Sequence, residues 1–189
     1  MNETKRILSP ELGYIFIFFS ITFISASMES GYYFLLPYLE GRGVAIGALG
    51  GVAMGICYGV SFFIRPFVPL FEQRFGDDKM LWGGYACFFM SAAGLALFSD
   101  AIGSIIVWRG ISGLGLSMVG VSLTAYERRF IPEKIRGRSI ALITTAYSLP
   151  SLIIVPAMEF LITRELYRCY IFFFPLLIAL GTIAIRRLP

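Results

Sequence analysis

Residues 12–36 read LGYIFIFFSITFISASMESGYYFLL, and Glu29 is the one charged residue among them. A helix of about 20 apolar residues crosses the hydrocarbon core of a bilayer. The stretch is longer than the apolar region of a secretory signal peptide, and no small-residue cleavage site follows it. We therefore expect this stretch to form the first membrane helix and to stay uncleaved.

Five more apolar blocks follow along the chain, which is 57% apolar and only 15% charged. The predicted spans are about 12–36, 44–71, 80–98, 102–126, 138–163 and 167–185. Backbone polar groups in lipid must be satisfied within the segment, and the alternating pattern of a membrane β-barrel is absent, so each span is predicted to be a helix. Residues 1–11 form the N-terminus, 12–185 the transmembrane domain and 186–189 a linker or tail; Glu127 to Arg138 is predicted to be the longest loop.

The basic residues between the spans predict the orientation of the chain. One side carries eleven of them and the other three: Lys5, Arg6, Arg74, Lys79, Arg128, Arg129, Lys134, Arg136, Arg138, Arg186 and Arg187, against Arg42, Arg164 and Arg168. Cytoplasmic loops carry the excess of lysine and arginine, so both termini are predicted to be cytoplasmic.

Composition also excludes several classes of function. The net charge of +4 is spread between apolar blocks and does not gather on one face, so no nucleic-acid partner is expected. The chain has three cysteines without CxxC spacing and no histidine, which argues against a metal site or cofactor. No HExxH motif, catalytic triad or Asp-rich metal motif occurs, so we do not expect an enzyme.

Three stretches resemble motifs of the major facilitator superfamily of transporters. Residues 69–79, PLFEQRFGDDK, resemble the loop signature GxxxDRxGRRK: Arg74, Gly76 and Lys79 match, while Pro69, Gln73, Asp77 and Asp78 depart from it. Residues 109–115, RGISGLG, resemble RxxQGxG with Ser112 in the glutamine position. Residues 132–139, PEKIRGRS, resemble PxxxRGRA and include Arg136.

The resemblance implies a fold and a direction of transport. It covers the first six of the family's twelve helices and implies two inverted three-helix repeats, with the first and fourth helices lining a cavity. Residues 151–156, SLIIVP, align with the GxxxGP motif of proton-coupled exporters, with Pro156 kept and both glycines replaced. Arg65-Pro66 and Ser148-Leu-Pro150 resemble drug and metallophore efflux members.

Charged residues inside spans are candidates for function. Glu29 and Arg109 lie about 10 Å inside the outer boundary on the first and fourth helices, by the rise of an α-helix. We expect them to form an ion pair or a site that exchanges a proton for an anionic or zwitterionic solute. The open alternative is a structural salt bridge between the two helices.

Other side chains are assigned to the same site or to gating. Glu159, Tyr33 and Tyr147 are candidates for substrate or proton contact, with an interfacial position as the alternative for Glu159 and an interface or packing role for the tyrosines. The resemblance implies a cytoplasmic gating motif, for which the candidates are Arg65, Arg74, Gly76, Lys79, Glu127 and Arg136. For Arg65, pairing with Glu127 or with lipid phosphate is expected rather than substrate contact.

Glycines and prolines are assigned to helix packing and bending. Gly47, Gly51, Gly55 and Gly59 recur every four residues, so they form one stripe that another helix can approach closely. The stripe is expected to face either a second half of the transporter or a helix of this chain. Further packing or bending positions are Gly113, Pro150 and Pro156.

The expected function is that of the N-terminal half of a secondary transporter, with proton-coupled efflux of a small organic solute. The alternatives are uptake in place of efflux, a truncated fragment, and a non-transporting scaffold or assembly subunit. The expected partners are the lipid bilayer, the solute, protons and a second six-helix half, supplied by the same chain, a separate subunit or a second copy. The expected location is a bacterial or archaeal inner membrane.

Overall fold

The computed structural model describes residues 10–188, and the part of the chain it describes is helical throughout, without strands. Six helical segments are long and apolar enough to cross a membrane: Leu12–Gly41, Gly47–Phe75, Asp77–Leu97, Ile102–Phe130, Glu133–Thr163 and Tyr167–Ile185. The prediction of an all-α membrane protein with six spans is confirmed. Lys5 and Arg6, which entered the orientation argument, lie outside the described residues.

Two of the six segments are interrupted by short 3₁₀ turns. The first consists of α1 (Pro10–Gly31), η1 (Tyr32–Phe34) and α2 (Leu35–Gly41). The second consists of η2 (Gly47–Leu49), α3 (Gly50–Ile64), η3 (Arg65–Phe67) and α4 (Val68–Phe75). The remaining four are continuous: α5 (Asp77–Leu97), α6 (Ile102–Phe130), α7 (Glu133–Thr163) and α8 (Tyr167–Ile185).

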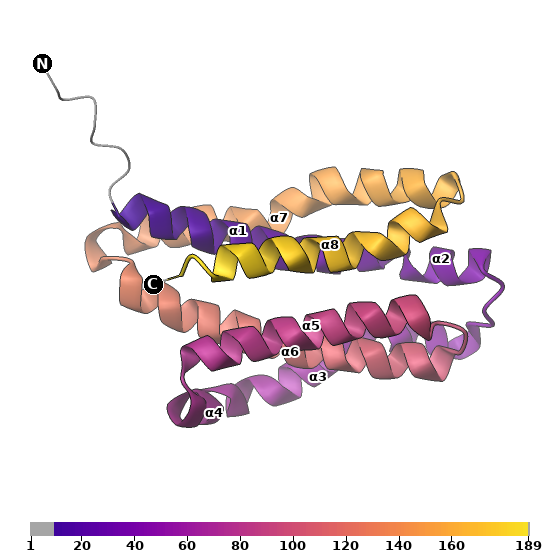
Figure 1. The fold of residues 1–189 in the computed structure, drawn as a ribbon, viewed down its shortest axis with the longest axis horizontal. Helices are drawn as coiled ribbons and strands as arrows, with labels where there is room; N and C mark the ends of the chain where they lie inside the picture. Colours follow the sequence, from indigo (N-terminus) through magenta and orange to yellow (C-terminus); the bar gives the residue numbers. More distant parts are fainter. Residues whose placement is uncertain (1–9, 189) are drawn as a thin grey trace, which may run out of the picture.

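The helices pack as two related groups of three spans. α1 contacts α7 and α8, just as α6 contacts α3 and α5, and the groups meet where α5 contacts α8 and α1 contacts α6 (Figure 1). Exchanging the first three spans for the last three reproduces this set of contacts. The first three spans form one repeat and the last three spans form the other. Because each repeat has an odd number of spans, the second repeat begins at the opposite end of the molecule from the first. The structure therefore has the inverted three-helix repeats that were expected.

The helix ends differ from the predicted span ends at several loops. The turn between α6 and α7 contains only Ile131 and Pro132, so the loop predicted over 127–138 is mostly helical. The first span continues past residue 36 to Gly41. Hydropathy marks the depth of the membrane, whereas basic and acidic residues beyond that depth still support a helix. Hydropathy therefore underestimates the length of these helices.

One glycine forms the whole junction between α4 and α5. Gly76 has φ +88° and ψ 152°, a backbone conformation that residues other than glycine rarely adopt. Its amide donates to the Glu72 carbonyl and its carbonyl accepts from the Met80 amide. The matching glycine of the loop signature is thus required by the backbone at this turn.

The turns alternate between the two ends of the bundle. The start of α1, the α4–α5 and α6–α7 junctions and the end of α8 lie at one end, and α2 with the α5–α6 and α7–α8 turns lies at the other (Figure 1). The positive-inside rule predicts that the first of these ends faces the cytoplasm, because most basic residues gather there. That orientation stays a prediction.

Candidate functional site

Glu29 and Arg109 meet between α1 and α6, as the intramembrane charges suggested. Glu29 Oε2 lies 3.5 Å from Arg109 Nη2. The Arg109 side chain is 1% exposed and that of Glu29 is 13% exposed, so the acid is the more accessible member of the pair. A buried charge requires a partner, and the carboxylate supplies it here.

The arginine is also held by an aromatic ring. Tyr32 follows Glu29 by one helical turn on the first span and lies on the same side of it. The Arg109 guanidinium carbon is 4.2 Å from the centroid of the Tyr32 ring, and that ring stacks on Phe174 of α8 at 4.3 Å. The ring covers the guanidinium, which fixes it in place beside Glu29 and away from solvent.

The second span, through α3, completes the surroundings of the pair. Cys57 Sγ of α3 lies 3.8 Å from Glu29 Oε1 and 3.9 Å from Ser112 Oγ of α6. Gly113 allows this approach, because a Cβ there would meet the backbone carbonyl of Cys57. The absence of a side chain at Gly113 therefore brings α3, and with it Cys57, against the acid.

Glu29 opens onto a cavity of about 460 Å³. Its walls come from α1, η1, α3, η3, α6 and α7 and carry aromatic rings, hydroxyls and two charges. The lining residues are Thr22, Ser25, Ala26, Glu29, Ser30, Tyr33, Tyr58, Ser61, Phe62, Arg65, Leu116, Val119, Gly120, Leu123, Tyr147 and Ser151. The cavity thus gathers Tyr33 and Tyr147 with Glu29, as expected, and adds Arg65, which had been assigned to gating.

Two further cavities continue from this one. They measure about 560 and 450 Å³, and both border Gly120 and Tyr147, as the first cavity does. One is also lined by Glu127, Arg128 and Arg136, and the other by Arg65, Glu72 and Arg128. A hollow therefore extends along α6 and α7 from Glu29 to the charged end of the bundle.

Several predicted residues lie apart from the cavity. Glu159 is exposed on α7 and is not part of the lining. Arg74 and Lys79 are exposed near the α4–α5 junction. Within residues 10–188, acid–base contacts of ion-pair length form at Glu29–Arg109 and Arg42–Asp100. Neither Arg65 nor Arg74 pairs with Glu127 in this conformation.

Arg136 holds the tight turn between α6 and α7. Its Nε and Nη2 donate to the Ile131 carbonyl at 3.3 Å, and Nη2 also donates to the Arg128 carbonyl at 3.2 Å. These carbonyls belong to the end of α6, where intrahelical partners run out. Arg136 therefore caps α6 in this conformation.

The glycine stripe on the second span is open. A Cβ at Gly47, Gly51, Gly55 or Gly59 would have nothing within 4 Å. The stripe therefore packs against no other helix of the described chain, in contrast to Gly113. Pro150 and Pro156 both lie inside the continuous helix α7, the first buried and the second exposed.

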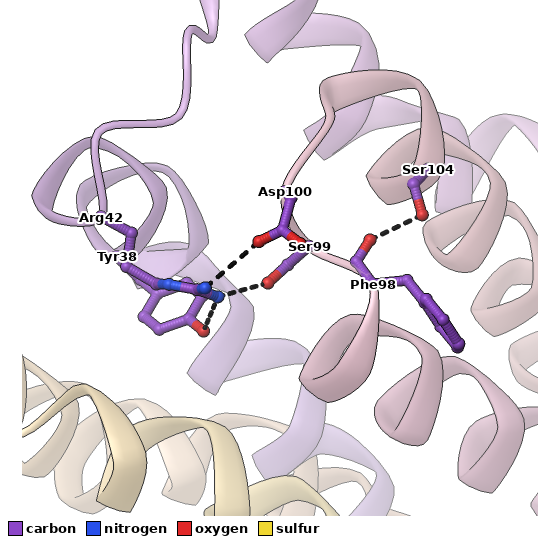
Figure 2. Close-up of polar contacts among 6 residues, drawn as sticks. All are labelled: Tyr38, Arg42, Phe98, Ser99, Asp100 and Ser104. Carbon is purple, nitrogen blue, oxygen red and sulfur yellow. Dashed lines mark hydrogen bonds and ion pairs between the residues drawn. The ribbon is translucent and has the colours of Figure 1, made fainter.

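A second polar cluster ties together turns at the opposite end. Figure 2 shows Arg42, at the end of α2, directed toward Ser99 and Asp100 in the α5–α6 turn. Arg42 donates to Ser99 Oγ at 2.7 Å, to the Tyr38 hydroxyl at 3.0 Å and to Asp100 Oδ1 at 3.2 Å. The Tyr38 hydrogen bond and the nearby Asp100 raise the pKa of Arg42 further, so the guanidinium stays charged.

Comparison with known families matches residues 3–155 to the Major Facilitator Superfamily. The chain belongs to this superfamily. The match covers the three motifs and the residues that contact Glu29 and Arg109 directly. Membership makes the chain part of a membrane transporter and disfavours the membrane-embedded enzyme that the sequence had already argued against. A search of curated proteins finds no match to this chain.

Sequence reasoning did not identify every residue of this candidate site. Cys57 was considered only for its lack of CxxC spacing, and nothing in the neighbouring sequence predicts its contact with Glu29. The contact of Tyr32 with the pair could have been predicted, because Tyr32 follows Glu29 by one helical turn. The Arg42 cluster requires residues from two turns far apart in sequence, so spacing alone does not reveal it.

Proposed function

We propose that this chain forms the N-terminal half of a secondary transporter that couples proton entry to the efflux of a small organic solute. The observation that carries the proposal is the position of Glu29, with Arg109 on one side and the cavity on the other. Substrate sites of such transporters lie near the middle of the membrane, between helix bundles.

Glu29 is the member of the pair that can change charge. An arginine keeps its proton in proteins, whereas a carboxyl group gains and loses one. Arg109 is covered by Tyr32, so the group that faces the cavity is the carboxylate. A proton and a positively charged group of a solute therefore compete for Glu29.

This competition supports exchange. When a proton binds Glu29, the attraction for a cationic group is lost and the solute leaves; when the solute binds, the proton leaves. An inward proton gradient then drives the solute outward. The sequence alone favoured an anionic or zwitterionic solute, but the burial of Arg109 favours a solute with a positively charged group at Glu29.

A second bundle is part of the proposal. Tyr33, Tyr58 and Tyr147 are about half exposed or more, and they line the cavity within apolar spans. Polar groups that face lipid without partners are costly, so this face is suited to an aqueous cavity closed by protein. A scaffold without transport activity, the alternative function, would have no need of a carboxylate that opens onto a cavity.

The test is proton release on binding of a cationic probe. Purified protein in weakly buffered detergent is titrated with ethidium while a pH indicator follows free protons. We expect proton release from the wild-type chain and none from Glu29→Gln, while both proteins remain folded. Glu159→Gln, which changes an exposed acid outside the cavity, should behave as wild type. Equal release from Glu29→Gln and wild type would contradict the proposal.

A further inference from the structure

Arg65 is the second charged side chain in the wall of the Glu29 cavity. It belongs to η3, the 3₁₀ turn that follows α3. Its Nη2 lies 3.7 Å from the point that a Cβ at Gly120 of α6 would occupy. The guanidinium therefore reaches across from the second span to the fourth, over a position where glycine leaves room. This places the charge on the cavity wall rather than in lipid.

The two charges are separated along the membrane normal. Cys57 contacts Glu29 and so marks its depth on the second span. Arg65 follows Cys57 by eight residues, which corresponds to about 12 Å at the rise of an α-helix. The carboxylate and the guanidinium thus stand at opposite ends of one cavity.

The two charges also differ in how they are compensated. Glu29 is balanced by Arg109, whereas Arg65 has no carboxylate at ion-pair distance within residues 10–188. A guanidinium inside a membrane span is costly without an anionic partner. Among the residues that line this cavity only Glu29 is an acid, and Glu72, which lines the adjoining cavity with Arg65, accepts a hydrogen bond from Ser122 Oγ.

The wall of the cavity carries aromatic rings among hydroxyl and aliphatic side chains. Tyr58 and Phe62 of α3 and Tyr147 of α7 contribute to it. Such rings accept an apolar body and also attract cations. A solute that fills this space can touch both charged ends only if it carries charges of both signs.

We propose that the solute is dipolar, with a cationic amine at Glu29, an oxyanion at Arg65 and an apolar body between them. This inference rests on the proposed role of Glu29 and adds the second contact. It assigns to Arg65 the recognition of solute, in place of the gating or lipid-anchoring role expected from sequence. The exchange of such a solute for one proton carries net charge across the membrane.

The test measures binding and requires no transport. The full chain is placed in phosphatidylcholine nanodiscs, and equilibrium dialysis against empty discs gives the affinity for 8-aminooctanoate, for octylamine and for 4-aminobutyrate. These probes are respectively dipolar and long, cationic only, and dipolar but too short to span the cavity. We expect 8-aminooctanoate to bind about tenfold more tightly than either of the others, because it alone makes both charge-assisted contacts.

Two variants separate the contacts. Arg65→Gln should weaken 8-aminooctanoate about tenfold and leave octylamine unchanged, whereas Arg74→Gln, an exposed arginine outside the cavity, should change neither. The inference is overturned if 8-aminooctanoate shows no advantage over octylamine, or if Arg65→Gln weakens both probes equally. Failure of the proposed function looks different, because Glu29→Gln would then leave the binding of both probes intact.

Discussion

Substitution of Gly113 by alanine tests the contact that brings Cys57 to the acid. A Cβ at Gly113 would overlap the Cys57 carbonyl oxygen and lie 3.0 Å from the Val60 Cβ and 3.1 Å from the Cys57 carbonyl carbon. These atoms belong to the α3 backbone or are bonded directly to it, so no side-chain rotation relieves the overlap. α3 and α6 must move apart, which also moves Cys57 away from Glu29.

The expected loss of stability in Gly113→Ala is worked out against a matched control, Gly59→Ala. Adding a methyl group to a packed core costs about 1–3 kcal/mol, while replacing a helical glycine by alanine stabilises a helix by roughly 0.5–1 kcal/mol. Gly59→Ala brings the second effect without the first, because a Cβ there has nothing within 4 Å. We therefore expect Gly113→Ala to be less stable than Gly59→Ala by about 1–3 kcal/mol.

The assay is reversible unfolding in mixed micelles with increasing dodecyl sulfate. Trp82 and Trp108 supply the fluorescence signal, and Trp108 lies on α6 close to the substituted position. The same variants should differ in ethidium-induced proton release, which Gly113→Ala is expected to reduce. Equal unfolding midpoints for the two alanine variants would refute the tight approach of α3 and α6.

Two further substitutions test single positions in the fold by the same unfolding assay. Gly76→Ala should destabilise the chain by about 1–3 kcal/mol, because alanine is strained at the positive φ of this residue. Gly103→Ala should not destabilise the chain, because a Cβ there has nothing within 4 Å. Similar unfolding midpoints for the two variants would contradict the requirement for glycine at position 76. Tyr170→Phe removes a buried hydroxyl that donates to the Gly31 carbonyl at 3.1 Å and should cost about 1 kcal/mol. Tyr85→Phe, whose hydroxyl has no hydrogen-bond partner within residues 10–188, should be nearly neutral, and an equal loss in both would count against the Tyr170 bond.

The number of spans was predictable because it depends on a quantity that the sequence carries directly, whereas the repeat architecture was expected from the family resemblance. An apolar stretch such as 12–36 must cross the membrane, whatever its neighbours are. The ends of the helices were less predictable. Charged segments such as residues 133–138 leave the apolar core yet continue the helix. Gly76 and Pro132 mark real boundaries, because glycine adopts a positive φ that ends a helix and proline has no amide hydrogen to donate within one.

The sequence predicts those residues of the site whose charge is energetically costly inside a membrane. Glu29 and Arg109 stand out because charges within spans are rare. Their contact, and the exclusion of Glu159 from it, depend on how each helix is rotated, which composition does not determine. The placement of Arg65 was not predictable for a related reason: its position near the end of a span suggested the interface, whereas in the structure it lines the cavity and its Nη2 approaches Gly120 of α6.

The open glycine stripe on α3 also bears on how long the chain survives after insertion. A helix flank without side chains presents its backbone to whatever lies beside it, and flexible acyl chains fit against such a flank less densely than an interlocking helix does. Until a protein neighbour covers Gly51, Gly55 and Gly59, this flank is the surface that membrane chaperones and proteases would encounter. If the proposed second bundle is the neighbour that covers this flank, the abundance of the chain in a cell should follow the supply of that bundle rather than the chain's own rate of synthesis.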